Sequence, residues 1–125
     1  MNLVDSSGWI EYLQDTDRAD LFAPAIEDRA ALLVPVIALF EVHRVLFRKV
    51  PSEAVQACLN VMRLGRVLDI TDARAVAAAE IAQRHRLAMA DAMMYSLAQE
   101  LKATFWTQDV DYEGLPGVSY FAKSV

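Results

Sequence analysis

Acidic side chains lie just after two segments of the chain that have the composition of strands. Asp5 follows the apolar segment 3–4, and Asp109 follows the β-rich segment 104–107 in TQDVDY. Because parallel α/β sheets bind ligands beside the carboxyl ends of their strands, both carboxylates are candidate cation ligands. The alternative for Asp5 is the capping of a helix that begins at Asp-Ser-Ser. Asp111 is an equally good candidate beside Asp109.

Two more acids, Glu41 and Asp91, lie on or beside the apolar stripes of predicted helices. Three of the four helical neighbours of Glu41 are apolar, and the face of Asp91 continues with core-like residues such as Met94. A buried carboxylate is costly unless it has a partner or a cation. The alternatives are an ion pair between Glu41 and Arg44, one turn further on, and helix capping by Asp91. Four such acids in one chain favour a shared role.

A carboxylate cluster without histidine or cysteine suits a hard cation, Mg²⁺ or Mn²⁺, and does not suit zinc. His43 and His85 have no metal-ligand spacing, and Cys58, the only cysteine, lies in an apolar helical pattern. The chain contains no GxGxxG, no phosphate loop ending in Gly-Lys-Ser/Thr and no GxSxG. The sequence therefore indicates cation-assisted chemistry in preference to nucleotide binding or serine hydrolysis.

The acids are positioned by short apolar strands that alternate with longer helices. Strands are predicted at 3–4, 32–35, 67–70, 104–107 and 118–121, and helices at 7–14, 19–29, 36–49, 53–64, 72–86 and 91–102. This alternation predicts an α/β fold with a parallel sheet covered by helices on both faces. The 125 residues are enough for one domain, 1–125, and leave no room for a second core.

The composition, 55% hydrophobic and 23% charged, is that of a globular protein. The longest apolar run, 30–40, is too short to span a bilayer, and no basic segment precedes a hydrophobic stretch at the N-terminus. We therefore expect a cytoplasmic protein with no membrane partner. The net charge of −5 argues against nucleic-acid binding unless several carboxylates converge on cations. Basic residues cluster in HRVLFRK (43–49) and RHR (84–86). If these segments are ordinary solvated helix faces, they have no role in nucleic-acid binding.

Four motifs, in order along the chain, resemble those of PIN-domain proteins, and most closely the VapC toxins of bacterial toxin–antitoxin pairs. They are VDSSGWIEYL at the start, FEVHRVL in the middle, ADAMMYSLA later and TQDVDY near the end. Each motif is weak alone, but the ordered set is specific and covers essentially the whole chain. The resemblance implies a PIN-like three-layer α/β/α sandwich with a short central parallel sheet. Tyr112 departs from the pattern, since phenylalanine is frequent at its position.

The resemblance also implies an activity, that of a Mg²⁺- or Mn²⁺-dependent endoribonuclease acting as the toxin of a VapBC-type pair. The family's four acids, catalytic residues and metal ligands at once, correspond here to Asp5, Glu41, Asp91 and Asp109. Its supporting hydroxyls correspond to Ser6 or Ser7 and to Thr107. The expected partners are an RNA substrate, a cognate antitoxin protein and a second copy of the chain in a homodimer.

Two other functions stay open, a catalytically silent PIN-fold binding module and a DNA-directed nuclease of the same superfamily. Phosphoryl-transfer domains with a strand-end Asp fit poorly, because a receiver domain needs a late lysine and a haloacid-dehalogenase-like phosphatase needs Asp-x-Asp. This chain has Asp-Ser-Ser at 5–7. Candidates for holding the phosphates that flank the scissile bond are Arg44, Arg48, Arg84 and Arg86.

Overall fold

The computed structural model describes residues 1–123, in which five parallel strands form one sheet with the order β3-β2-β1-β4-β5. The strands are β1 (Asn2–Val4), β2 (Leu32–Pro35), β3 (Arg66–Leu68), β4 (Thr104–Thr107) and β5 (Val118–Tyr120). The helices are α1 (Ser6–Leu13), α2 (Ala19–Ile26), α3 (Val36–Leu46), α4 (Ser52–Met62), α5 (Asp72–His85) and α6 (Met89–Glu100). Two short 3₁₀ turns, η1 (Arg29–Ala31) and η2 (Val110–Tyr112), complete the described elements.

Every predicted strand and helix is present, and the differences lie at the element ends. The predicted helix 36–49 ends at Leu46, and the predicted helix 19–29 ends at Ile26 before η1. Helix α6 begins at Met89, because Ala88 is its N-cap and the Ala88 carbonyl accepts the first helical bond, from the backbone N–H of Ala92. Asp91 therefore lies in the first turn of α6, and the interpretation of Asp91 as the N-cap is wrong.

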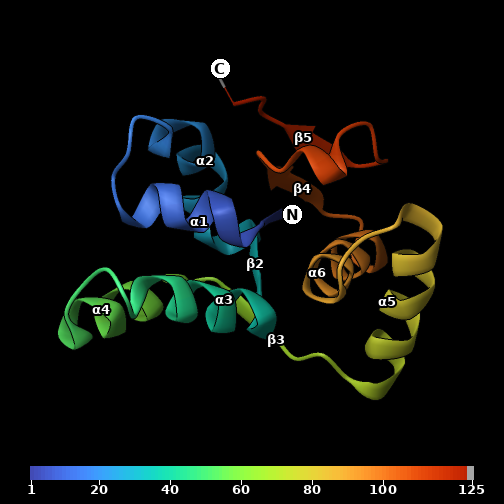
Figure 1. The fold of residues 1–125 in the computed structure, drawn as a ribbon, viewed down its shortest axis with the longest axis horizontal. Helices are drawn as coiled ribbons and strands as arrows, with labels where there is room; N and C mark the ends of the chain where they lie inside the picture. Colours follow the sequence, from blue (N-terminus) through green and yellow to red (C-terminus); the bar gives the residue numbers. More distant parts are fainter. Residues whose placement is uncertain (124–125) are drawn as a thin grey trace.

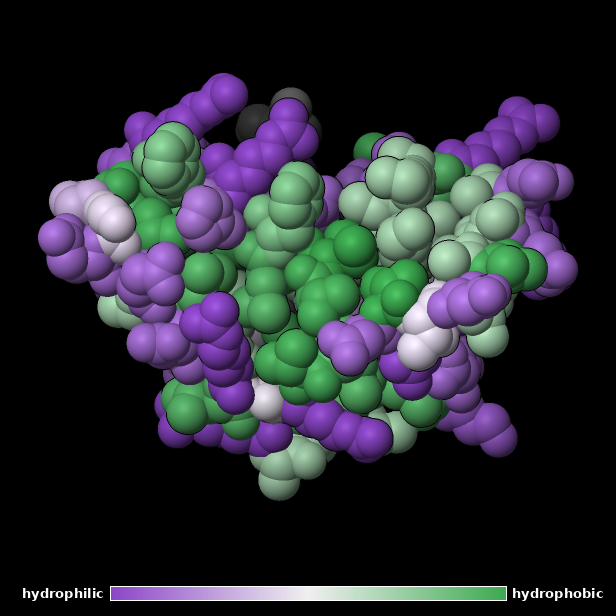
Figure 2. Space-filling view, turned by 90° about the horizontal axis from the view of Figure 1, so that it is seen from below, coloured by the Kyte–Doolittle hydropathy of each residue, from purple (hydrophilic) through white to green (hydrophobic). Residues whose placement is uncertain are grey.

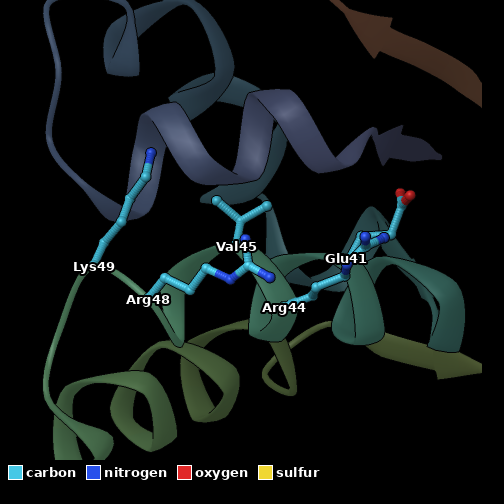
Figure 3. Close-up of a pocket in the computed structure, with 5 residues that line it drawn as sticks. All are labelled: Glu41, Arg44, Val45, Arg48 and Lys49. Carbon is cyan, nitrogen blue, oxygen red and sulfur yellow. The ribbon is translucent and has the colours of Figure 1, made fainter.

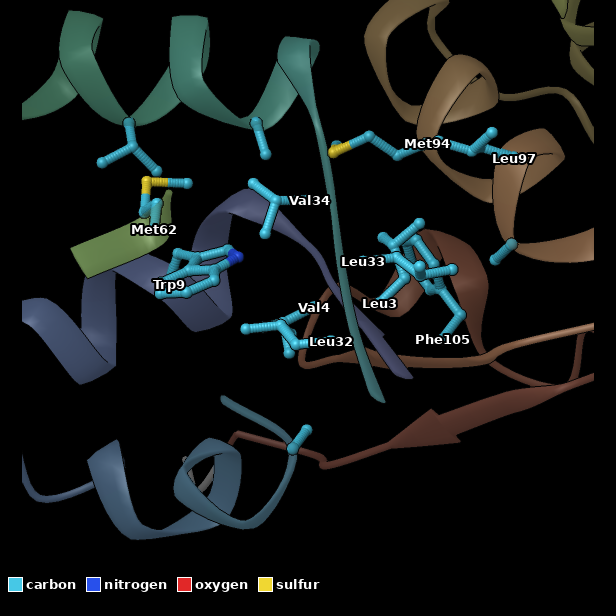
Figure 4. Close-up of a cluster of buried hydrophobic side chains, with 14 of the residues drawn as sticks. Leu3, Val4, Trp9, Leu32, Leu33, Val34, Met62, Met94, Leu97 and Phe105 are labelled. Atoms are coloured by element: carbon cyan, nitrogen blue, oxygen red, sulfur yellow. The ribbon is translucent and has the colours of Figure 1, made fainter. Parts of the chain in front are cut away.

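Helices cover both faces of the sheet. Figure 1 shows α1 to α4 on one side of the molecule and α5 and α6 on the other. Strand side chains alternate between the two faces. One set, Val4, Leu32 and Val34, lies on the side of Trp9 from α1 and Met62 from α4 (Figure 4). The other set, Leu3, Leu33 and Phe105, lies on the side of Met94 and Leu97 from α6 (Figure 4). The predicted three-layer α/β/α sandwich is thus confirmed.

The strand order reverses between β1 and β4, which are neighbours in the sheet but lie far apart in the sequence. From β1 the chain proceeds through β2 to β3 at one edge, and then returns to place β4 on the other side of β1. The backbone N–H of Asp5 donates to the Trp106 carbonyl at 3.1 Å, so the segments that follow both strands stay side by side. Ligands of open α/β sheets bind in the crevice at such a reversal, outside the carboxyl ends of the strands.

No helix among the described residues is long and apolar enough to cross a membrane.

Candidate active site

Asp5 is buried at the end of β1, where three donors hold its carboxylate. The Thr107 hydroxyl donates to Oδ2 at 2.6 Å, the Gly8 backbone N–H donates to Oδ1 at 3.0 Å, and the Ser7 hydroxyl lies 2.9 Å from Oδ1. The bond from the Gly8 backbone N–H makes Asp5 the N-cap of α1, so the alternative that Asp5 caps a helix is confirmed. Burial raises the pKa of Asp5 to about 6, although the three hydrogen bonds oppose this shift. Asp5 is therefore both a helix cap and an orientated carboxylate.

Glu41 is positioned by α1 and has no basic partner. The Ser6 hydroxyl donates to Glu41 Oε1 at 2.6 Å and lies 3.8 Å from the Met94 sulfur, so the start of α1 contacts both α3 and α6 at this point. Among residues 1–123, the salt bridges are Arg18–Glu11 and Arg74–Glu100. The alternative of a Glu41–Arg44 ion pair is therefore wrong. Figure 3 shows the Glu41 carboxylate pointing away from α3 towards the end of β1.

Three carboxylates approach one another between α6 and the loop after β4. One oxygen from each of Asp91, Asp109 and Asp111 lies within 4.8 Å of the others. The loop is held in shape because the Asp109 backbone N–H donates to Thr107 Oγ1 at 2.9 Å and the Asp111 N–H donates to Asp109 Oδ1 at 2.9 Å. Since Thr107 also donates to Asp5, one chain of hydrogen bonds links β1 to this cluster.

The charges of these acids act on one another. Burial raises the pKa of Asp91, and the charges of Asp109 and Glu41 raise it further. The charge of Asp109 also raises the pKa of Asp5. Neighbouring negative charges repel one another and disfavour the ionised forms of these carboxyls. A bound cation offsets this repulsion.

Tyr112 brings a hydroxyl into this site that the sequence did not assign to it. The side chain is fully buried, and its hydroxyl makes no hydrogen bond to any described residue that meets the usual geometric criteria. Burial and the charge of Asp91 raise the pKa of Tyr112, which keeps the hydroxyl protonated. It is close enough to Asp91 to offset part of the rise in the pKa of that carboxyl. The only sign of this contact in the sequence was that Tyr112 stands where phenylalanine is frequent in PIN-domain proteins.

The structure brings Asp5, Glu41, Asp91 and Asp109 to the carboxyl edge of the sheet, and it adds Asp111 beside Asp109 without replacing it. Donors from α1 and β4 hold Asp5 and Glu41, while Asp91 and Asp109 form the close cluster. Ser6, Ser7 and Thr107 all contact these acids, so both candidate serines are used. An oxygen-only set of this kind fits a hard divalent cation.

A model of the PIN domain matches residues 3–117 of the chain. The chain belongs to the PIN domain family. PIN domains are generally nucleases that use divalent metal ions. The match includes all four predicted acids, and it confirms the resemblance seen in the sequence motifs.

Solved structures agree with this assignment. A toxin–antitoxin complex from Klebsiella pneumoniae is similar at a TM-score of 0.80 and 20% identity, over 95% of this chain and 96% of that one. FitAcB from Neisseria gonorrhoeae is similar at a TM-score of 0.71 and 19% identity, over 98% of this chain and 97% of that one. Mycobacterium tuberculosis VapC20, described as a toxin that cleaves the sarcin–ricin loop, is similar at a TM-score of 0.70 and 19% identity. The match covers 83% of this chain and 85% of that one. A search of curated proteins finds no match.

A buried polar network in this PIN domain supports the loop that carries Asp109. Gln108 is 4% exposed and stands between two site residues. Its Oε1 accepts a hydrogen bond from Arg18 Nε at 2.5 Å, and its Nε2 donates to Glu11 Oε2 at 2.9 Å. Arg18 also donates to the Phe121 carbonyl at 3.0 Å. The network therefore joins α1, the loop before α2 and the segment after β5 beneath the carboxylate cluster.

We expect Gln108→Ala to lower the free energy of unfolding by about 2 kcal/mol, because it removes two part-buried hydrogen bonds together with the buried side chain that makes them. Nuclease activity should fall with it, since the Asp109 loop loses its support. The matched control is Gln99→Ala. Gln99 is exposed and donates one bond to the Pro116 carbonyl at 2.9 Å, so its loss should cost less than about 1 kcal/mol. Urea denaturation measures both variants, and equal free energies would show that the Gln108 network does not stabilise the loop.

Proposed function

We propose that this PIN domain is a Mg²⁺- or Mn²⁺-dependent endoribonuclease that acts in the cytoplasm as the toxin of a VapBC-type toxin–antitoxin pair. The observation that carries the proposal is the convergence of four acids from different parts of the chain at the strand-order reversal. Three aspartate oxygens there, from Asp91, Asp109 and Asp111, lie within 4.8 Å of one another. Similarity to a toxin that cleaves the sarcin–ricin loop, an RNA element, supports RNA as the substrate.

The residues that would hold the cation are Asp5, Glu41, Asp91 and Asp109, with Asp111 in reach. The chemistry that Mg²⁺ or Mn²⁺ would supply there is activation of a water molecule and neutralisation of charge on the scissile phosphate. The chain's own contribution is orientation: Ser6 fixes Glu41, and Thr107 and Gly8 fix Asp5. The site uses no histidine as a base. His43 stacks on Phe47, and His85 packs edge-on against Tyr95.

An antitoxin partner is supported by the similarity to toxin–antitoxin complexes and by a hollow of about 470 Å³. Its lining comes mainly from α1, α2 and α4, and it combines apolar residues such as Leu13, Ala23 and Val61 with charged ones such as Asp20 and Glu27. We expect a segment of the antitoxin to pack there with its apolar side chains.

A homodimer is supported by exposed apolar side chains on α3, β3 and α5. Phe40 and Phe47 are 62% and 68% exposed, Val76 is 60% exposed, and Val67 lies on β3, which is at the edge of the sheet. Figure 2 shows apolar side chains gathered in the middle of the face seen from below Figure 1, with hydrophilic ones around them. Apolar surface gathered on one face of a molecule is typical of a protein contact.

The proposal is tested by incubating the purified protein with total RNA, with and without Mn²⁺, and by mapping the cleaved ends. We expect cleavage at defined positions that depends on the cation. Cleavage of single-stranded DNA with intact RNA would point instead to a DNA-directed nuclease. Calorimetry that detects no Mn²⁺ binding would point to a catalytically silent binding module.

A further inference from the structure

A basic hollow on α3 continues directly from the carboxylate site. It measures about 340 Å³, and we call it the α3 hollow. Its lining residues are Glu41, Arg44, Val45, Arg48 and Lys49. Figure 3 shows Glu41 at the end nearest the strands, Arg44 on α3, and Arg48 and Lys49 beyond the end of the helix, with Lys49 reaching towards α1. A metal-site acid and three cations thus share one surface.

The cations of the α3 hollow form no salt bridge with any described residue. Arg44, Arg48 and Lys49 are exposed, and they take part in none of the salt bridges formed by residues 1–123. The chain as a whole carries a net charge of −5, so this concentration of positive charge is local. Such an arrangement attracts an anionic ligand from outside the molecule.

We propose that the α3 hollow holds the backbone of single-stranded RNA as it leaves the carboxylate site. This inference rests on the proposed nuclease function. Arg44 follows Glu41 by three residues on α3, and Arg48 and Lys49 lie just beyond the end of the helix at Leu46. The strand therefore has its scissile phosphate at the carboxylates and its next phosphates at Arg44 and then at Arg48. The cations come from one short segment, 44–49, on one side of the site, which matches one strand and not the two backbones of a duplex.

The lining of the hollow favours nucleic acid over an acidic protein segment. Val45 is its one apolar lining residue, whereas peptide recognition relies on pockets for apolar side chains. Phosphate contacts need only positive charge at suitable intervals, and they give affinity without sequence preference. The hollow therefore sets the path of the strand and not the choice of cleavage sequence.

The test measures RNA binding in an Asp91→Asn background, so that cleavage does not interfere. A short fluorescein-labelled single-stranded RNA is titrated at several salt concentrations, with and without the double substitution Arg44→Gln and Arg48→Gln. Each lost phosphate contact should lower the slope of log affinity against log salt by about 0.7, and the pair should weaken binding roughly 25-fold at 0.1 M salt. In the otherwise unchanged enzyme, the pair should raise KM for RNA and leave kcat nearly unchanged.

The matched control is Arg63→Gln with Arg66→Gln, which removes the same charge. These arginines lie at the end of α4 and the start of β3, the edge of the sheet opposite the carboxylates. We expect the control slope to stay close to that of the background. Equal slopes in the test and control pairs overturn the α3 inference, and so does tighter binding of duplex RNA than of the single strand. If the unaltered protein cleaves no RNA with Mn²⁺, the proposed function itself fails.

Discussion

Asp91→Asn should abolish cation-stimulated RNA cleavage, with a loss of more than about a hundredfold. The substitution preserves the size of the side chain, and it removes one of the three carboxylates that lie within 4.8 Å of one another. Only the charge and one ligand change, because Asp91 lies in the first turn of α6 and does not cap the helix. A gel assay with a labelled RNA and added Mn²⁺ measures the loss.

The same variant should keep its fold, and without added cations it should be at least as stable as the original protein at pH 7. Burial and the charges of Asp109 and Glu41 raise the pKa of Asp91, so the folded protein disfavours its ionised form. Neutralising the side chain removes that unfavourable charge. Loss of activity together with undiminished stability separates a role in the reaction from a role in folding.

Asp72→Asn is the matched control, since Asp72 is also an acid in the first turn of a helix but is exposed on α5. It should retain activity within about twofold and lose about 0.3–1 kcal/mol of stability, the usual contribution of such a charge to a helix N-terminus. Full cleavage by Asp91→Asn, or an equal loss of activity in both variants, would remove Asp91 from the active site.

The sequence predicted the fold and the placement of the acids because both follow from local patterns. Short apolar strands and longer amphipathic helices are visible as periodicities, and parallel strands bring the residues after β1 and β4 to one edge. Asp5 and Asp109 could be located by this rule alone. Glu41 and Asp91 were found as carboxylates on apolar helix faces, where an acid needs a reason.

The contacts that hold these acids could not be read from the sequence. Gln108 pairs with Glu11, 97 residues away, and no periodicity connects the two. Glu41 is bound by Ser6, 35 residues away, whereas helical spacing had pointed to Arg44 as its partner. Such pairs depend on how helices pack across the sheet, which local patterns do not determine.

The second large effect concerns Asp5 and pH. Without a cation, the folded protein holds a proton on Asp5 up to about pH 6, whereas the unfolded chain releases it near the ordinary value of 3.8. The folded state therefore binds more protons between these values, and the contribution of Asp5 to the free energy of unfolding falls as pH rises through this window. The difference in pKa corresponds to about 3 kcal/mol. Most acids, whose pKa is lowered on folding, have the opposite effect.

Asp5→Asn isolates this contribution, because the amide oxygen can still accept the Gly8 N–H while the titrating group is gone. We expect the original protein to lose about 2.4 kcal/mol relative to Asp5→Asn between pH 4 and pH 7, as measured by urea denaturation with a chelator present. Parallel pH curves for the two proteins would show that Asp5 is not buried as a raised-pKa acid.

Adding Mn²⁺ at pH 7 should reverse that loss, because a cation that binds only the folded state stabilises it by about 2.7 kcal/mol at a hundred times its dissociation constant. Without a cation, the folded protein disfavours the ionised forms of Asp5 and Asp91, and a bound cation would offset that cost. Asp5→Asn should show a much smaller shift in melting temperature, and Asp72→Asn should show the full shift. An equal shift in all three proteins would place the stabilising cation elsewhere and separate Asp5 from the metal site.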